Sequence, residues 1–148
     1  ASNLERLNRW ASAFRMWQER PHTGWGLGTY QFQYAPFQHS SQLTVISTNA
    51  GDLGNAHSEY IGPLAEQGWP GLVLVLLLLV LLFRTGSRAY RRMEPGTDRT
   101  LVLLAMLGLV TYWVHGVLNN FLDLDKGAVL VWMSAAVIAW AGRAAARD

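Results

Sequence analysis

Apolar residues gather in long runs in the second half of the chain, whereas the first half mixes apolar and polar positions. The longest run extends from Leu72 to Phe83, and its flanks predict a helix over residues 70–89. Two further apolar stretches predict helices over residues 100–118 and 127–143. Helices of about 20 apolar residues cross the roughly 30 Å hydrocarbon core of a bilayer. The pattern therefore predicts an all-α integral membrane protein with three transmembrane helices.

Residues 2–20 predict a helix before these spans, because apolar side chains recur there at spacings of three and four. The apolar positions on that face are Leu4, Leu7, Trp10, Phe14 and Trp17. Arginine and glutamate occupy the other faces, and Pro21 ends the helix. Such a helix either lies at a membrane interface or packs on its own protein.

Residues 21–56 show little regular periodicity. The glycine-interrupted segment from Pro21 to Tyr30 is either a tight turn or a loop whose free N–H groups hold a phosphate. The segments 30–34 and 43–47 are rich in β-prone residues and predict short strands or extended arms.

Short polar segments separate the predicted helices. Residues 58–67 predict a short helix at the interface, which Gly68 ends before Pro70 begins the first span. Residues 84–99 form a connector, and residues 119–126 form a short acidic hairpin.

Arginine positions predict the orientation of the spans. The connector and the C-terminal tail carry Arg84, Arg88, Arg91, Arg92, Arg99, Arg143 and Arg147. Arginine-rich segments next to transmembrane helices remain in the cytoplasm. Residues 1–67 are therefore expected to form an extracytoplasmic loop with short helices, and residues 68–148 to hold the three spans.

The composition narrows the class of protein. The chain has 148 residues, of which 51% are hydrophobic and 15% charged, so one membrane domain over residues 1–148 is expected. The net charge of +2 gives no reason to expect a nucleic-acid partner, and without cysteine there is no disulfide framework or thiolate metal site. Because the chain starts without methionine and carries few spans, it is expected to be the C-terminal part of a longer protein.

His57 is the leading candidate for chemistry in the outer segment. Neutral imidazole is a competent base near neutral pH, although a lone histidine can equally be structural. Glu59 and Tyr60 follow it directly and could orient it. Arg6 and Arg9 share a helix face at a spacing of three, so they could hold one anion together or be ordinary solvated charges.

A second group of polar residues lies near the outer end of the second span. The spacing of Tyr112, His115 and Asn119 predicts a common helix face, which either lines a substrate cleft or forms hydrogen bonds between helices. Asp52 and Asp123 are suitable types of metal ligand, but no paired-ligand spacing occurs. Neither a metal nor a cofactor is expected.

Several segments, in their order and spacing, resemble the C-terminal core of the O-antigen ligase and O-antigen polymerase superfamily. They are Arg9-Trp10, Pro21–Gly28, Ala56–Gly68, Pro70-Gly71 and the hairpin Leu118–Lys126. The resemblance covers nearly the whole chain. It implies a polytopic helical bundle of the GT-C type in the bacterial cytoplasmic (inner) membrane, with the active site on the extracytoplasmic face and more spans than this chain contains.

The resemblance also implies an activity. Members transfer a glycan from an undecaprenyl-pyrophosphate carrier to a hydroxyl acceptor, and ligases of the group are expected to work without metal. The acceptor is lipid A-core in ligases, another carrier-linked repeat in polymerases and a protein in related enzymes. His57 matches the essential histidine of the family, as general base, and Arg9 matches the arginine that binds pyrophosphate. The further candidates for substrate binding are Arg6, Glu59, Tyr60, His115 and Asn119.

The residues leave two alternatives open. Ligase, polymerase and protein glycosyltransferase are not separated by this sequence. From a different class, the chain could be a non-enzymatic membrane module of a glycan export or assembly system. A polar outer loop that carries His57 and Arg9 beside the bilayer favours the enzyme.

Overall fold

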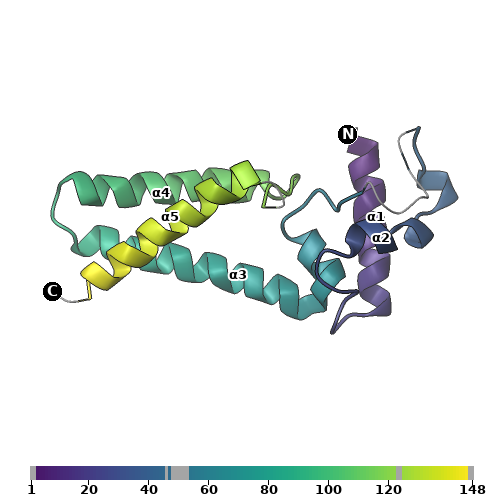
Figure 1. Cartoon of the computed structure of the whole chain (residues 1–148), viewed down its shortest axis with the longest axis horizontal. Helices are drawn as coiled ribbons and strands as arrows, with labels where there is room; N and C mark the ends of the chain where they lie inside the picture. Colours follow the sequence, from purple (N-terminus) through teal and green to yellow (C-terminus); the bar gives the residue numbers. More distant parts are fainter. Residues whose placement is uncertain (1–2, 46, 48–53, 123–124, 147–148) are drawn as a thin grey trace. The chain divides into compact units, whose positions relative to one another are not determined.

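The computed structural model describes residues 3–45, 47, 54–122 and 125–146. In chain order its elements are α1 (Asn3–Glu19), α2 (Tyr30–Gln33), the 3-10 turns η1 (Ala35–Phe37) and η2 (Ser40–Gln42), α3 (Ile61–Arg92), α4 (Thr97–His115) and α5 (Asp125–Ala144) (Figure 1). The described residues contain no strand, so the predicted all-α fold class is confirmed.

The chain forms two compact units. The first contains Ala1–Val75 and Gly116–Asn120, and the second contains Leu76–His115 and Phe121–Asp148. The first unit therefore includes α1, α2 and the start of α3, whereas the second includes most of α3 together with α4 and α5. Both leading candidates for catalysis lie in the first unit.

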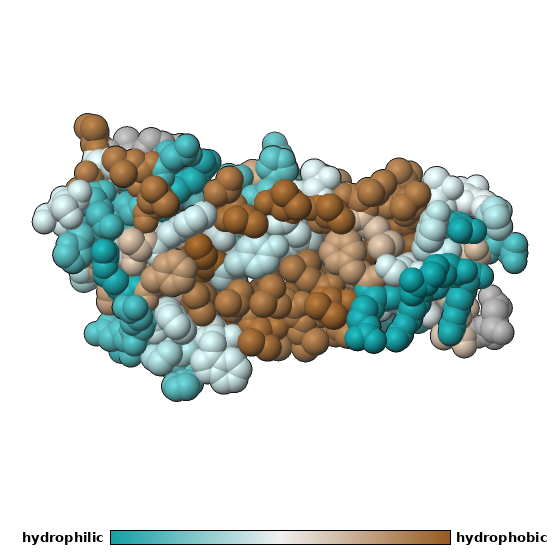
Figure 2. Space-filling model, turned by 180° about the vertical axis from the view of Figure 1, so that it is seen from behind, coloured by the Kyte–Doolittle hydropathy of each residue, from teal (hydrophilic) through white to brown (hydrophobic). Residues whose placement is uncertain are grey.

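Three helices, α3, α4 and α5, are each long and apolar enough to cross a membrane. In the second unit their exposed side chains include Leu77, Leu81, Leu104, Leu107, Leu130 and Met133. Figure 2 shows in brown how extensive this apolar surface is. Apolar surface on this scale is unfavourable in water and favourable against lipid. The protein is therefore a membrane protein.

Small residues allow the helices of the second unit to pack closely. One buried cluster of this unit consists of Ala89, Val102, Ala141 and Ala145. Gly86 of α3 lies so near α4 that a side chain at this position would press on Met106. Close approach of this kind holds membrane helices together, because lipid provides no hydrophobic driving force between them.

Helix α1 packs on its own protein, as one of the two expectations for it proposed, but several residues of its apolar face are exposed. Leu4 and Leu7 are each 58% exposed, and Phe14 is 42% exposed. The buried positions are instead Glu5, Asn8, Arg9, Ser12, Ala13 and Met16. The helix thus packs on its own unit through its polar face, and the location of its apolar face at a membrane interface stays a prediction.

The polar face of α1 is buried because loop residues provide hydrogen-bond partners for it. Asn8 Nδ2 donates to Gln38 Oε1 at 3.1 Å and to Ser47 Oγ at 3.3 Å. Arg15 Nη1 donates to the carbonyl oxygen of Phe37 at 2.7 Å. Polar groups that find partners lose little on leaving water. The loop can therefore cover the face that the sequence pattern assigns to solvent.

The two predicted strands do not occur in the described residues. Tyr30–Gln33 is the helix α2, and the rings of Tyr30 and Tyr34 stack with their centroids 5.3 Å apart. The described part of residues 43–47 carries no strand either. A spacing of four places two side chains on one helix face, and both tyrosines are buried. Burial of this pair, rather than the weak alternation around it, decides the local structure.

The predicted break between the short interfacial helix and the first span is confirmed. Gly68 has φ 69° and ψ −164°, which interrupts α3. The N–H of Trp69 donates to the carbonyl oxygen of Pro21 at 2.9 Å, and a side chain at Gly68 would overlap that oxygen. Glycine adopts this backbone conformation without strain. The break therefore also fixes the end of the loop that follows α1.

Candidate active site

His57 lies on a tight turn just before α3. Its φ of 48° is unusual for a residue with a side chain, and its N–H donates to Asn55 Oδ1 at 3.1 Å. The hydroxyl oxygen of Ser58 accepts from the N–H groups of Tyr60 and Ile61, each at 3.3 Å, and so caps the start of the helix. Backbone contacts on both sides therefore fix the position of the histidine.

A further contact fixes the same turn from a distant part of the chain. The N–H of Glu59 donates to the carbonyl oxygen of Gly116 at 2.8 Å, and both residues belong to the first unit. Glu59 itself is 6% exposed. The segment that follows α4 in the sequence therefore contributes to the surroundings of His57.

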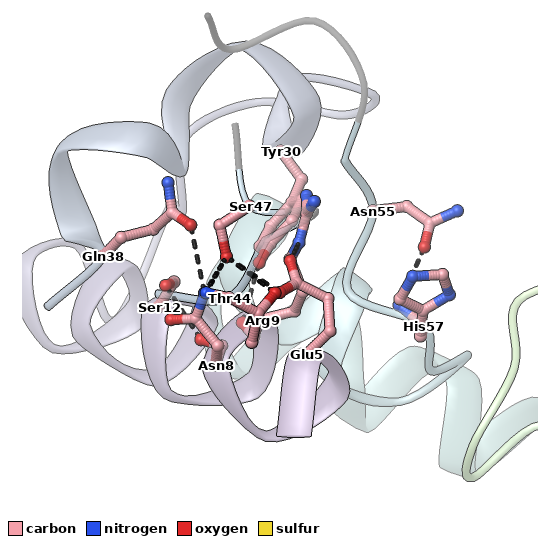
Figure 3. Close-up of polar contacts among 10 residues, drawn as sticks. All are labelled: Glu5, Asn8, Arg9, Ser12, Tyr30, Gln38, Thr44, Ser47, Asn55 and His57. Carbon is pink, nitrogen blue, oxygen red and sulfur yellow. Dashed lines mark hydrogen bonds and ion pairs between the residues drawn. The ribbon is translucent and has the colours of Figure 1, made fainter. Parts of the chain in front are cut away.

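Arg9 extends from α1 beside the segment that carries His57 (Figure 3). It is buried, and its Nε donates to Glu5 Oε1 at 2.8 Å. Its guanidinium lies 4.3 Å from the centre of the Tyr34 ring, at cation–π distance. Gly54 passes so close that a side chain there would overlap Nη1 of Arg9. Because Gly54 precedes His57 by only a few residues, the arginine and the histidine adjoin one short segment.

Part of the Arg9 guanidinium has no partner within the described chain. Its Nη1 is buried and makes no hydrogen bond to any described residue. A buried donor without an acceptor is costly. This nitrogen is therefore suited to an anion that arrives with a substrate.

The surroundings of His57 favour its neutral form. Burial lowers the pKa of the His57 imidazole, and the positive charges of Arg9 and Arg6 lower it further, while the negative charge of Glu5 acts in the opposite direction. Since the net shift is downward, the imidazole is neutral at neutral pH and can accept a proton. The dependence on both arginines also means that their charges reach the histidine.

A family model described as O-antigen ligase matches residues 1–76 of the 148-residue chain. The chain belongs to the O-antigen ligase family. Comparison with curated proteins and with solved structures gives no match. The predicted family is therefore confirmed, and the protein is, in general terms, an O-antigen ligase-like membrane glycosyltransferase. The matched residues include both Arg9 and His57.

Three expected substrate-binding residues of this O-antigen ligase family protein lie in the same unit as Arg9 and His57: Arg6, Glu59 and Tyr60. Arg6 Nη1 donates to Asn3 Oδ1 at 3.2 Å. Burial raises the pKa of the Tyr60 phenol, and the negative charge of Glu59 raises it further. Tyr60 is therefore a neutral hydrogen-bonding group at neutral pH.

The predicted common helix face of Tyr112, His115 and Asn119 is wrong. Helix α4 ends at His115, and residues 116–118 form a turn, so helical spacing does not extend to Asn119. His115 is exposed and belongs to the second unit, whereas Asn119 is half-buried and belongs to the first. The turn opens with a glycine, which has low helix propensity.

The glycine-rich loop before α2 is a tight turn, and the alternative of a phosphate site on its free N–H groups is wrong. Trp25 and Gly26 donate to backbone carbonyl oxygens of α3 at 3.3 Å and 2.8 Å. The Glu66 carboxylate accepts from the N–H groups of Gly28 and Tyr30, each at 2.9 Å. These amides are therefore already occupied.

The sequence reasoning overlooked Glu5. Its carboxylate pairs with Arg9 through one oxygen and accepts from the hydroxyl groups of Thr44 and Ser47 through the other. Burial by itself raises the pKa of Glu5, but hydrogen bonds from Thr44, Arg9 and Ser47 and the charge of Arg9 outweigh it, so that the pKa is lowered. The spacing of four between Glu5 and Arg9 is the sequence signal for this pair.

Metal ligands do not gather in the described part of the chain. Within it, no group of three or more histidine, aspartate or glutamate side chains is placed to hold a metal ion. Asp52 and Asp123, two of the ligand types considered, lie outside the described residues. The positive charge around His57 comes from Arg9 and Arg6.

Proposed function

We propose that this protein transfers a glycan from an undecaprenyl-pyrophosphate carrier to a hydroxyl acceptor, with His57 as general base and Arg9 as pyrophosphate ligand. The observation that supports the proposal is that Arg9 lies beside the short segment that leads to His57. Arg9 lies against Gly54, and its charge lowers the pKa of His57. A cation beside a neutral base suits a reaction that must remove a proton and release an anion.

In the proposed reaction, His57 takes the proton of the acceptor hydroxyl while the hydroxyl oxygen attacks the anomeric carbon of the glycan. The bond between that carbon and the carrier phosphate breaks on the opposite face, and its electron pair leaves with the pyrophosphate. One displacement inverts the configuration at the anomeric carbon. Solvent then removes the proton from the imidazole.

The leaving pyrophosphate gains negative charge, which fixed cations stabilise. Guanidinium groups form charge-assisted and often bidentate hydrogen bonds to phosphate oxygens. Arg9 is already held by Glu5 and Tyr34, so it needs little rearrangement as the charge develops. Arg6 adds a second positive charge. In this mechanism arginine, rather than a metal ion, supplies the stabilising charge.

Four further residues are proposed to contact the substrates, whether the acceptor is lipid A-core, another carrier-linked repeat or a protein. They are Glu59, Tyr60, His115 and Asn119. Glu59 and Tyr60 follow His57 directly in the sequence. His115 and Asn119 flank the turn whose first carbonyl oxygen accepts from the N–H of Glu59.

The reaction is proposed to take place on the extracytoplasmic face of the bacterial cytoplasmic membrane. Exposed arginines at the end of α3 are Arg84, Arg88, Arg91 and Arg92. The positive-inside rule assigns such a segment to the cytoplasm. The residues that precede the first span then face outward, and the prenyl chain of the carrier remains in lipid.

Substitutions in the full-length protein test the proposal. His57→Ala and Arg9→Ala are each expected to reduce transfer by about 10²-fold or more, with unchanged insertion into the membrane. His39→Ala is the matched control, because His39 is an exposed histidine elsewhere in the outer segment. Surface-glycan profiles and protein levels in membranes are measured together. A wild-type profile in either variant removes that residue from the mechanism.

The same profiles distinguish the acceptors. A strain that lacks a ligase accumulates unattached polymer on the carrier, whereas a strain that lacks a polymerase retains single repeats. A protein glycosyltransferase is revealed by loss of glycan from a protein. If both variants retain normal glycans and an analogue of the carrier pyrophosphate binds independently of Arg9, the non-enzymatic module is supported instead.

A further inference from the structure

Glu5 is a buried carboxylate beside the candidate active site, and the mechanism above uses it only as a partner of Arg9. It is 1% exposed and lies one helical turn before Arg9 on α1. Replacement of a buried ion pair by apolar residues of similar volume is often neutral or stabilising. Stability alone is therefore a weak reason for an ion pair at this position.

The two oxygens of Glu5 have different partners. Oε1 accepts from Arg9 Nε at 2.8 Å. Oε2 accepts from the hydroxyl groups of Thr44 and Ser47, the latter at 2.8 Å. Ser47 Oγ also accepts from Asn8 Nδ2 at 3.3 Å. The carboxylate cannot turn without loss of these bonds, so it forms a fixed support for the arginine.

Three groups surround the Arg9 guanidinium, and Figure 3 draws one of them, Glu5. Glu5 holds the Nε edge, the Tyr34 ring lies below one face, and the backbone at Gly54 lies against Nη1. An ion pair arranged for strength alone favours bidentate contact with a guanidinium. Here the contact to Glu5 is made through Nε, and the buried Nη1, against which Gly54 lies, has no hydrogen-bond partner among the residues that the structure describes.

We propose that Glu5 is a positioning residue for glycan transfer, which fixes Arg9 through Nε so that the outer guanidinium nitrogens face the diphosphate of the carrier. This inference rests on the proposed function of Arg9. Thr44 and Ser47 support Glu5 from behind through their hydroxyl groups. A displacement of about 1 Å in a reacting group can lower a rate by about 10²-fold, so such support has a measurable effect.

Glu5 also acts on His57 through its charge. Its negative charge raises the pKa of His57. Burial and the positive charges of Arg9 and Arg6 lower that pKa, and the net shift is downward. Removal of the Glu5 charge therefore lowers that pKa further, and activity is lost at a lower pH when the medium is acidified. A residue with a merely structural role would leave this limb of the pH profile in place.

The experiment measures kinetics of the full-length enzyme in membranes, per mole of folded protein. Glu5→Ala is expected to lower kcat/KM for the carrier-linked glycan by about 10- to 100-fold, with an unchanged KM for the acceptor. Glu5→Gln keeps an oxygen acceptor for Nε and is expected to lose only about two- to tenfold. In both variants the acid limb of the pH profile of kcat/KM is expected to move to lower pH. Glu19→Gln, an exposed glutamate on the same helix, is the matched control and changes neither quantity.

A double-mutant cycle separates this inference from the proposed function. If Glu5 acts through Arg9, the addition of Glu5→Ala to Arg9→Ala causes no further loss of transfer. Additive losses overturn the inference. Wild-type kinetics in Glu5→Ala with an inactive Arg9→Ala overturn it as well, but leave the proposed function intact. Wild-type transfer in Arg9→Ala removes both.

Thr44→Val addresses the case in which Glu5→Ala does not fold. This change removes one hydroxyl donor to Oε2 at similar volume, and is expected to lower kcat/KM for the carrier-linked glycan by about two- to fivefold. In an Arg9→Ala background it is expected to have no effect. Unchanged kinetics in both Thr44→Val and Glu5→Gln contradict a positioning role.

Discussion

The two compact units of this protein differ in whether their described residues include buried polar side chains. In the first unit, α1 buries an ion pair, an amide and a hydroxyl: Glu5, Arg9, Asn8 and Ser12. In the second unit, the buried side chains among the described residues are apolar and include Ala89, Val102, Leu109 and Ile138. Large apolar side chains are exposed in both units. The two units therefore differ in the chemistry of their buried residues, and not in whether apolar side chains are exposed.

This contrast has a functional consequence. Buried polar groups are stable only in a defined arrangement with their partners, so a small displacement is costly and position is strongly specified. A packed cluster of alanine and valine is destabilised only by steric overlap or by a cavity. Substitutions in the first unit should therefore alter rate, and substitutions in the second should alter stability.

Among the substitutions that test this contrast between the units, Gly54→Ala in the first unit has the largest expected effect. A methyl group at this position would overlap Nη1 of Arg9, so the guanidinium must move. Transfer per folded protein is expected to fall by about 10²-fold, as measured with purified full-length enzyme and carrier-linked glycan. Gly62→Ala is the control, because its methyl group would meet only the side chain of Ala56 at 3.9 Å. Wild-type kinetics in Gly54→Ala would mean that the position of the guanidinium does not matter.

An intermediate effect, on stability, is expected from Gly86→Leu in the second unit. The new side chain would overlap Met106 and crowd Ile138, and overpacking of this kind typically costs about 1–3 kcal/mol. Thermal unfolding in detergent measures the loss. Gly108→Leu is the matched control, because no atom lies within 4 Å of the added group there. If Gly86→Leu lowers the rate per folded protein instead of the Tm, the contrast between the units fails.

The smallest expected effect is a shift in the pH profile caused by Arg6→Gln. The positive charge of Arg6 lowers the pKa of His57, so its removal raises that pKa and activity is lost at a higher pH on acidification. The wild-type acid limb should itself lie below the pH at which an ordinary histidine titrates. Arg20→Gln, an exposed arginine at the end of α1, serves as control. The pH dependence of kcat/KM provides the measurement, and an unshifted limb in Arg6→Gln would show that this charge does not reach the base.

Local signals predicted the helices well. The apolar runs gave three potential spans because only a helix of that length satisfies its backbone within lipid. The break at Gly68 followed from a glycine and a proline placed two residues apart. Both features depend on residues close together in the sequence, so no knowledge of the tertiary structure was needed.

Errors arose where distant residues compete for the same surface. Residues 30–34 were expected to form a short strand or an extended arm, but Tyr30–Gln33 is helical, and the Tyr30 hydroxyl donates to the distant carbonyl oxygen of Arg9 at 2.7 Å. Asn119 was placed on the face of α4, but a turn intervenes whose carbonyl oxygen binds the N–H of Glu59. In each case a contact outside the local segment outweighs a weak local preference.

The sequence alone determined that this is a helical membrane protein with three imidazoles and several guanidinium groups before its first span, since hydropathy and residue order are properties of the chain itself. Only the tertiary structure decided which face of α1 is buried, because the hydrogen-bond partners of that face lie 30 to 42 residues further along the sequence, at Gln38, Thr44 and Ser47. It also decided that Arg9 is held by Glu5 and Tyr34 next to the segment of His57. A hydrogen bond between residues far apart in the sequence leaves no periodic trace, and the burial of polar groups depends on such bonds.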